Sequence, residues 1–215
     1  MHTKSLFFNF TFSFLLIFQF SCNNNSDWVE YDKIEIVRST RDSTYYLDGK
    51  HFEGKIKKIN KDGFESTIFN VKNGILNGAY FEFFNNGNSK IKSSYKGGKL
   101  EGKFISYYEN KNIKEETNFN QGLINGNRKL YWSNGSIKEL SILKFGVLTG
   151  ECLFYYSNSN LRKKILFDNY GNRDGVWLDY YQNGYIKNEI EYKSGKIIVP
   201  MKKYDRNGNL LKTSL

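Results

Sequence analysis

The sequence predicts an all-β protein, an elongated antiparallel β-meander of about six to seven β-hairpin repeats that forms a single-layer twisted sheet. Three observations support this prediction. Glycine recurs with a period of 24 or 25 residues over most of the chain. The segments between the glycines are rich in aromatic and β-branched residues, which favour strands. Asn-Gly pairs, a strong hairpin signal, follow the aromatic residues in most repeats.

Residues 1–21 are predicted to be a signal peptide. They hold one formal charge, Lys4, and an apolar run, Leu6–Phe20, that is too short to span a bilayer comfortably. Ser21-Cys22 then resembles a bacterial lipoprotein cleavage site, which implies lipid attachment to Cys22. A plain secretion signal with an incidental Cys22 and an uncleaved anchor are the two alternatives. We therefore expect an exported, membrane-anchored lipoprotein of the periplasm or cell surface.

Three regions follow the signal peptide. Residues 22–28 are predicted to be a polar tether, and residues 29–47 an N-terminal cap strand in which Ile34 and Ile36 alternate with polar residues. Residues 48–215 are the repeat domain, and we expect no second domain. With lipid on Cys22, Cys152 is the only free thiol, so no intrachain disulfide is expected.

Each repeat within residues 48–215 is marked by glycines at fixed positions. The glycines that open the repeats are Gly49, Gly74, Gly98, Gly122, Gly146, Gly171 and Gly195. A second glycine follows four or five residues later, and a third lies in the Asn-Gly pairs, such as Asn134-Gly135. We predict type I′ turns at these pairs, with positive φ at both residues. In the last repeat Val199-Pro200 replaces the second glycine, and proline suits an edge strand.

The best-preserved repeats resemble a known family. Residues 74–87 read Gly-Ile-Leu-Asn-Gly-Ala-Tyr-Phe-Glu-Phe-Phe-Asn-Asn-Gly, which is similar to the bacterial variant of the MORN repeat (membrane occupation and recognition nexus). The resemblance covers roughly residues 45–212. It implies a role in binding: bacterial proteins of this type are commonly labelled antitoxins of toxin–antitoxin systems, and other MORN proteins act as scaffolds or are proposed to contact membranes. A cytosolic antitoxin does not need the export signal that is predicted for residues 1–21.

No catalytic site is expected from the chemistry-bearing residues. His51, the only histidine after the signal peptide, is interpreted as a surface residue, and Cys152 as a packing substitution at a position that is usually aromatic. Asp168, Asp174 and Asp179 crowd one repeat and are interpreted as turn formers rather than calcium ligands. We therefore predict that the protein is not an enzyme and has neither a cofactor nor a metal site.

One basic residue lies three positions beyond the turn position in five consecutive repeats, in two of which Lys111 and Ser159 replace the turn glycine. These residues are Lys90, Lys114, Lys138, Arg162 and Lys187. Because equivalent residues lie two strands apart, about 9.6 Å, they are predicted to form a stripe of roughly 40 Å. Such a stripe suits an anionic surface such as lipid headgroups, polysaccharide or an acidic protein. The alternative is neutralisation by cross-strand ion pairs with Glu115, Glu116, Glu139, Glu189 and Glu191.

Paired aromatic residues end the first strand of most repeats. Because adjacent strand residues point to opposite faces, the pairs predict two aromatic ladders. The first ladder, a candidate binding face, contains Tyr107, Tyr131, Tyr155 and Tyr180. The second contains Phe84, Tyr108, Trp132, Tyr156 and Tyr181. Packing between hairpins is the simplest interpretation, and an open binding surface is the alternative.

The leading functional hypothesis is a non-enzymatic, membrane-anchored repeat protein that acts as a binding or scaffold module in the bacterial cell envelope. Its expected partners are the membrane, through the lipid anchor, and a protein or another envelope component. The main alternative is an antitoxin or immunity protein that neutralises a toxin by direct binding, and a cell-wall hydrolase ranks third. Nucleic acid is not expected as a partner because the chain is exported.

Overall fold

The computed structural model describes residues 28–39 and 43–214. The predicted signal peptide, Cys22 and most of the tether lie outside the described residues. The elements are β1 (Trp28–Glu30), the 3₁₀ helix η1 (Tyr31–Lys33), β2 (Glu35–Arg38), β3 (Ser43–Leu47), β4 (Lys50–His51), β5 (Gly54–Ile59), β6 (Glu65–Lys72), β7 (Ile75–Phe83), β8 (Ser89–Lys96), β9 (Lys99–Leu100), β10 (Gly102–Tyr107), β11 (Ile113–Asn120), β12 (Leu123–Tyr131), β13 (Ile137–Lys144), β14 (Val147–Tyr155), β15 (Leu161–Phe167), β16 (Gly175–Tyr180), β17 (Ile186–Lys193), β18 (Lys196–Tyr204) and β19 (Leu210–Ser214).

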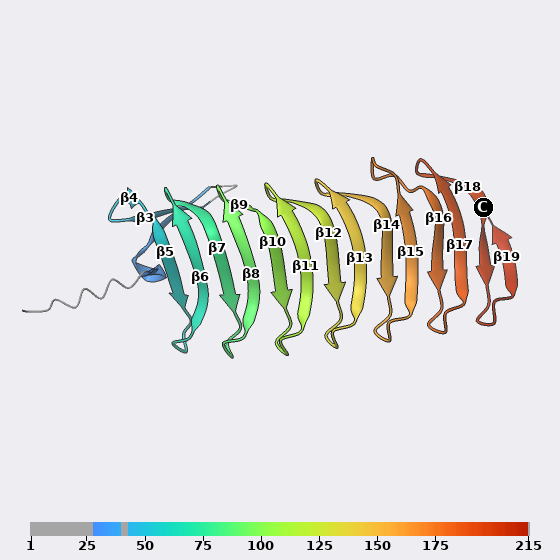
Figure 1. The fold of residues 1–215 in the computed structure, drawn as a ribbon, viewed down its shortest axis with the longest axis horizontal. Helices are drawn as coiled ribbons and strands as arrows, with labels where there is room; N and C mark the ends of the chain where they lie inside the picture. Colours follow the sequence, from blue (N-terminus) through green and yellow to red (C-terminus); the bar gives the residue numbers. More distant parts are fainter. Residues whose placement is uncertain (1–27, 40–42, 215) are drawn as a thin grey trace, which may run out of the picture.

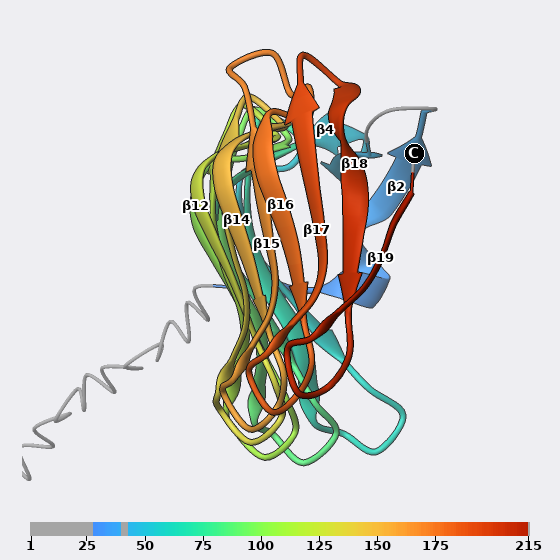
Figure 2. The same ribbon diagram turned by 90° about the vertical axis from the view of Figure 1, so that its right-hand side faces the viewer.

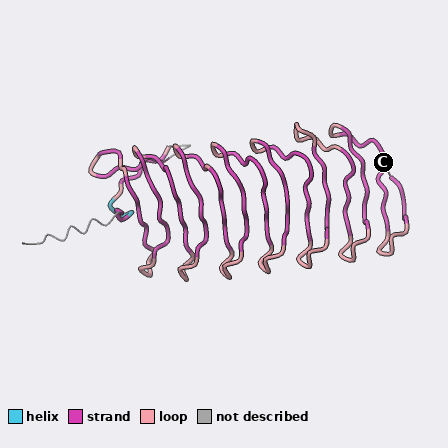
Figure 3. The backbone as a smooth tube through the Cα atoms, in the orientation of Figure 1, coloured by secondary structure: helices cyan, strands magenta, loops and turns pink. Residues whose placement is uncertain are grey.

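The predicted β-meander is confirmed. A 16-stranded sheet runs from β5 to β19 in chain order, with β9 pairing beside β8 (Figure 1). Neighbouring strands are antiparallel, except that β1 joins the first edge by parallel pairing with β5. The loops alternate between the two long edges of the sheet (Figure 3). Each repeat therefore contributes one hairpin to a continuous ribbon of strands.

The N-terminal region differs from the predicted cap strand. Residues 29–47 are divided among the end of β1, η1, β2 and β3, and a separate three-stranded sheet has the order β2-β3-β4. This small sheet lies on one side of the main sheet (Figure 2). Ile34 and Phe52 are buried with Ile56, Phe69 and Val71 of β5 and β6 in one apolar cluster. This region therefore packs against the main sheet as a second layer instead of extending the meander.

The type I′ turns lie at the opposite edge from the one predicted. At Asn134-Gly135 only the glycine has positive φ, 86°. The Gly135 N–H donates to the Trp132 carbonyl (2.9 Å) and the Trp132 N–H to the Ser136 carbonyl (2.8 Å), as in a type I turn followed by a left-handed glycine. Asn134 Oδ1 accepts the Ser136 N–H at 3.0 Å, which explains why asparagine recurs here without adopting positive φ.

All the repeat-opening glycines except Gly171 occupy the type I′ turns instead, whereas Gly171 lies in a turn of the same kind as Gly135. At the turn between β13 and β14, Phe145 has φ = 48° and Gly146 has φ = 85°, and Lys144 pairs with Val147 across them. The two-residue turns of this kind are Asp48-Gly49, Asn73-Gly74, Gly97-Gly98, Gln121-Gly122, Phe145-Gly146 and Ser194-Gly195. Only Asn73-Gly74 among these six turns is an Asn-Gly pair, so the Asn-Gly pairs used for the prediction pointed to the wrong edge.

Pro200 also differs from its expected place. It lies in β18, which pairs with strands on both sides, and not in an edge strand. The register with β17 shifts here, because Glu189 pairs with Lys202 while Glu191 pairs with Val199. A proline fits this irregular stretch because the regular ladder, with its required N–H, is interrupted there.

The two faces of the main sheet differ in character. The core face, defined by Ile56, Phe69, Thr117, Cys152 and Ile165, carries the buried side chains. The outer face carries a mixed row that crosses the strands in register. Its members are Glu116, Lys129, Leu140, Leu153, Lys164, Leu178, Glu189 and Lys202. Buried side chains are therefore concentrated on one face of the sheet.

Candidate binding surface of the repeat sheet

The second aromatic ladder joins consecutive repeats through hydrogen bonds. In each case the ring donates to a backbone carbonyl 23 or 24 residues further along the chain. The bonds are Tyr108 Oη to the Tyr131 carbonyl (2.8 Å), Trp132 Nε1 to Tyr155 (3.2 Å), Tyr156 Oη to Tyr180 (2.8 Å) and Tyr181 Oη to Tyr204 (2.9 Å). These rings are consequently held in place by two repeats at once.

The predicted basic stripe lies over aromatic rings. The cation-to-ring-centroid distances are 6.0 Å for Lys90 and Phe84, 5.8 Å for Lys114 and Tyr108, 4.7 Å for Lys138 and Trp132, 5.9 Å for Arg162 and Phe154, and 5.7 Å for Lys187 and Tyr181. We call these five cations with their rings the cation–aromatic ladder. Four of the rings belong to the second aromatic ladder, whereas Arg162 uses Phe154 of β14.

None of the five predicted glutamates neutralises the stripe in the described residues. Lys90 pairs instead with Glu82, and Lys114, Lys138, Arg162 and Lys187 form no ion pair with any described residue. The stripe therefore presents four cations that lie over aromatic rings and keep an unpaired positive charge.

Among the described residues, four of the five expected glutamate partners, all except Glu191, pair with other cations. Arg128 lies between Glu115 (3.2 Å) and Glu139 (3.4 Å), Lys103 pairs with Glu116 (3.0 Å) and Lys202 with Glu189 (2.8 Å). Hydrogen bonds from Lys103 and Lys202 lower the pKa of Glu116 and Glu189, respectively, below the usual range. These carboxylates are thus ionised and already satisfied away from the stripe.

The first aromatic ladder is partly buried rather than open. Tyr107, Tyr131, Tyr155 and Tyr180 are all of intermediate exposure. Tyr131 Oη donates to Glu116 at 3.0 Å, and burial, followed by this bond, raises the pKa of Tyr131. Lys92 lies 5.5 Å from the centroid of Tyr107. These contacts favour the packing interpretation of this ladder over the open binding surface.

The residues considered for catalysis do not converge. Exposed His51 contacts Tyr46 (Nε2 to Oη, 3.2 Å), whereas Cys152 is 1% exposed and burial raises its pKa to about 11. Asp168 accepts the backbone N–H groups of Tyr170 and Asn172 within a turn. In residues 28–39 and 43–214, no cluster of three or more His, Cys, Asp or Glu could hold a metal ion. No helix in these ranges is long and apolar enough to cross a bilayer.

Asp174 and Asp179 are separated by their partners. Asp174 pairs with Lys193 (3.3 Å) at a turn, while Asp179 pairs with Lys163 (3.0 Å) within the sheet. Asp179 also lines a hollow on the core face with Trp177 and Asn188, which the sequence analysis missed. The only sequence signal for this hollow is a tryptophan two residues before an aspartate within one strand.

Comparison with known proteins supports the repeat assignment. No curated protein matches the chain. Residues 76–96, 100–121, 148–169 and 173–194 match the MORN repeat variant. The matched segments contain most residues of the two aromatic ladders and of the basic stripe, but not Tyr131, Trp132 and Lys138. These four repeats are therefore similar to the MORN repeat variant, and MORN repeats are generally binding or scaffold modules.

Proposed function

We propose that this chain is a non-enzymatic binding or scaffold module that recognises an extended anionic partner through the cation–aromatic ladder. The observation that carries the proposal is the row Lys114, Lys138, Arg162 and Lys187, which has no carboxylate partner among the described residues. Four glutamates of the same strands, Glu115, Glu116, Glu139 and Glu189, pair with other cations. The net charge of +10 adds long-range attraction for an anion.

The geometry suits many weak contacts better than one strong contact. Neighbouring cations are expected to lie about 9.6 Å apart, because equivalent residues are separated by two strands. An exposed cation–ring contact contributes about 0.5–1 kcal/mol, so no single member dominates. The hydrogen-bonded rings limit the motion of the cations above them, which lowers the entropy lost when several contacts form together.

The proposal is tested by removing the four unpaired charges. A variant with Lys114→Gln, Lys138→Gln, Arg162→Gln and Lys187→Gln is compared with a control in which Lys103, Lys164, Lys193 and Lys202, all ion-paired, become glutamine. The probes are phosphatidylglycerol vesicles, phosphatidylcholine vesicles and soluble poly-glutamate. We expect at least about tenfold weaker binding of an anionic probe by the ladder variant, a smaller loss in the control, and weaker binding at high salt.

The three probes distinguish the possible sources of negative charge. Binding to phosphatidylglycerol vesicles alone indicates a lipid surface, whereas binding to poly-glutamate alone indicates an acidic polymer or protein. Equal losses in both variants would show that net charge, not the ladder, drives binding. An unchanged affinity of the ladder variant would contradict the proposal.

We further propose that lipid on Cys22 holds this module at a bacterial membrane, outside the cytoplasm. The support is the sequence pattern of residues 1–22. Metabolic labelling with a palmitate analogue should tag the full chain and fail in Cys22→Ala. The control is Cys152→Ala, which removes the other cysteine and should be tagged normally. Normal tagging of Cys22→Ala would disprove the anchor.

An antitoxin or immunity role is the second candidate. It is favoured by the match to the MORN repeat variant together with the resemblance of that variant to proteins labelled as antitoxins. A long, rigid ladder also offers an acidic protein face many simultaneous contacts. Co-expression of residues 22–215 should relieve the toxicity of a toxin encoded beside this gene, and the ladder variant should not. Failure of the unmodified chain to rescue growth would count against this role.

A further inference from the structure

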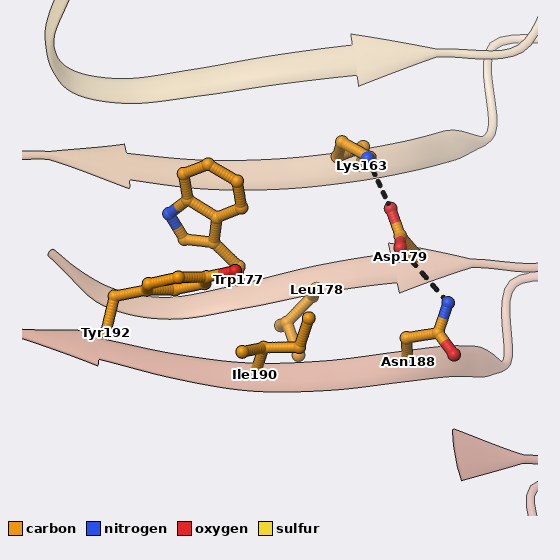
Figure 4. Close-up of a pocket in the computed structure, with 7 residues that line it drawn as sticks. All are labelled: Lys163, Trp177, Leu178, Asp179, Asn188, Ile190 and Tyr192. Carbon is orange, nitrogen blue, oxygen red and sulfur yellow. Dashed lines mark hydrogen bonds and ion pairs between the residues drawn. The ribbon is translucent and has the colours of Figure 1, made fainter. Parts of the chain in front are cut away.

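A hollow of about 210 Å³ lies on the core face across β15, β16 and β17 (Figure 4). Its lining residues are Lys163, Trp177, Leu178, Asp179, Asn188, Ile190 and Tyr192. Figure 4 shows aromatic rings at one end and a polar group at the other, with Ile190 between them. The hollow is therefore amphipathic along the direction of the strands.

The aromatic end is rigid. The ring centroids of Trp177 and Tyr192 are 4.8 Å apart, and Trp177 Nε1 donates to the Leu166 carbonyl at 2.9 Å. The Arg173 guanidinium packs on both rings, at 4.8 Å from Trp177 and 5.3 Å from Tyr192, and its Nη1 donates to Tyr192 Oη at 3.3 Å. The rings are thus fixed before any ligand arrives, which reduces the entropy cost of binding.

The polar end is charge-balanced and keeps unused hydrogen-bonding capacity. Lys163 Nζ lies 3.0 Å from Asp179 Oδ1, and Asn188 Nδ2 donates to Asp179 Oδ2 at 3.2 Å. A lysine ammonium has three donors, and an asparagine amide has two donors and one acceptor. Within the described residues, Lys163 and Asn188 therefore retain donors, and Asn188 an acceptor, for a ligand.

We propose that this hollow binds a single neutral sugar ring. A balanced Lys–Asp pair favours a ligand without net charge, and the combination of fixed aromatic rings with amide and ammonium donors matches the apolar C–H face and the hydroxyl groups of a pyranose. The volume lies below the roughly 300 Å³ at which pockets for drug-sized ligands begin, so it limits the ligand to about one ring. This inference rests on the proposed binding function and assigns it a second ligand class, a glycan.

The preceding repeat lacks the side chains that line the hollow. There Cys152 and Phe154 occupy the positions of Trp177 and Asp179. Cys152 supplies no ring, and Phe154 supplies no carboxylate to hold a lysine and an asparagine together. The β7–β8 repeat has Tyr80 and Glu82 at these two positions, but Ile91 stands there in place of Asn188.

The test follows the indole N–H signals of ¹⁵N-labelled full-length chain in detergent micelles during titration with methyl glycosides of glucose, galactose and N-acetylglucosamine. Trp28, Trp132 and Trp177 give separate signals, so a saturable shift can be assigned. We expect at least one sugar to shift the Trp177 signal with a dissociation constant of about 1–10 mM. Asp179→Asn should weaken binding at least about tenfold, and Asp174→Asn, which breaks the separate pair with Lys193, should not.

Two further variants keep the result interpretable. If Asp179→Asn does not fold, Asn188→Ala replaces it with the same expectation. The ladder variant with four glutamines should bind the sugar like the unmodified chain, so failure of the anionic-partner proposal and failure of this one are separable. The inference is overturned if no sugar shifts the Trp177 signal, including the case in which p-cresol, an aromatic probe, does shift it. It is also overturned if the Asp179→Asn and Asp174→Asn variants bind the sugar with equal affinity.

Discussion

The two ends of the main sheet bury their side chains in different ways. At the N-terminal end the small sheet covers β5 and β6, and the buried cluster is wholly apolar: Ile34, Phe52, Ile56, Phe69 and Val71. In the later repeats, which form a single layer in Figure 2, the buried positions include polar residues. Thr117 and Ser141 are 1% and 3% exposed, and their hydroxyls donate to Glu115 and Glu139.

This difference shows that one layer can exclude water without a covering sheet. Long side chains from adjacent strands close over the small residues, and partly exposed carboxylates accept hydrogen bonds from the buried hydroxyl groups of Thr117 and Ser141. Single apolar side chains such as Cys152 and Ile165 are also buried in the single layer, whereas the wholly apolar cluster lies where the second layer covers the sheet.

The largest expected effect comes from truncating an isoleucine in each region. Ile56 is 0% exposed in the covered end and Ile165 is 8% exposed in the single layer. We expect Ile56→Ala to cost about 4 kcal/mol and Ile165→Ala about 2 kcal/mol, because the open site can relax around the lost atoms. Urea unfolding measures the totals, and amide exchange in β6 and β15 measures the local effects. Equal costs would mean that the small sheet adds no protection.

The second effect concerns the thiol of Cys152 in the single layer. Burial raises its pKa from 9.0 to about 11, so the folded chain should contain roughly 100-fold less thiolate at pH 8 than the unfolded chain. Alkylation by iodoacetamide should be slower by at least this factor until urea is added. Because the unfolded thiol ionises first, this group should lower stability as the pH rises from 9 towards 11. Rapid alkylation of the native chain would show that the single layer admits solvent.

A smaller effect is expected along the second aromatic ladder. Tyr156→Phe removes the donor to the Tyr180 carbonyl and should cost about 1 kcal/mol. Phe84, at the start of the ladder, has no hydroxyl, so Phe84→Tyr should stabilise the covered end by about 0.5 kcal/mol if it donates to the Tyr107 carbonyl. Tyr185→Phe, at a 52% exposed residue, is the control and should be neutral. Urea unfolding midpoints measure the stability of each variant. An unchanged midpoint for Tyr156→Phe would argue against stabilisation by the hydrogen bonds between the rings and the next repeat.

The smallest effect concerns the type I′ turns. Asn73 near the covered end and Phe145 in the single layer both hold positive φ, 51° and 48°. Asparagine tolerates this conformation better than a bulky residue, and Phe145 is 55% exposed. Phe145→Asn should therefore raise stability by about 0.5 kcal/mol, and Asn73→Phe should lower it by a similar amount. Thermal unfolding measures the change in stability of both variants. Stability changes of the same sign in the two variants would exclude backbone strain as the cause.

Much of the fold followed from periodicity, but its details did not. The spacing of glycines such as Gly98 and Gly122 predicted hairpins in chain order, because a two-stranded unit repeated head to tail has few other ways to pair. The turn types were misassigned, because Asn134 uses its side chain to bind the Ser136 N–H instead of adopting positive φ. The covering sheet was also missed, because the short alternating segment around Ile34 and Ile36 is compatible with several partners.

The candidate surface was predicted in part. A repeat of 24 residues places Lys114 and Lys138 in one row whatever their partners, so the stripe could be anticipated. The partner of each carboxylate could not be anticipated, because Arg128 and Lys103 pair with Glu115 and Glu116 and leave Lys114 without an ion pair among the described residues. The hollow beside Trp177 depends on three strands at once and left only a faint trace in the sequence.

Local rules were sufficient for the order of strands, the hairpin length and the alternation of faces, since each depends on neighbours within about 24 residues. Long-range contacts decided which charges are neutralised, which rings are pinned and where a second layer is added. The physical reason is that pairing between side chains is a competition among all groups within reach, and that set is defined only once the strands are packed together.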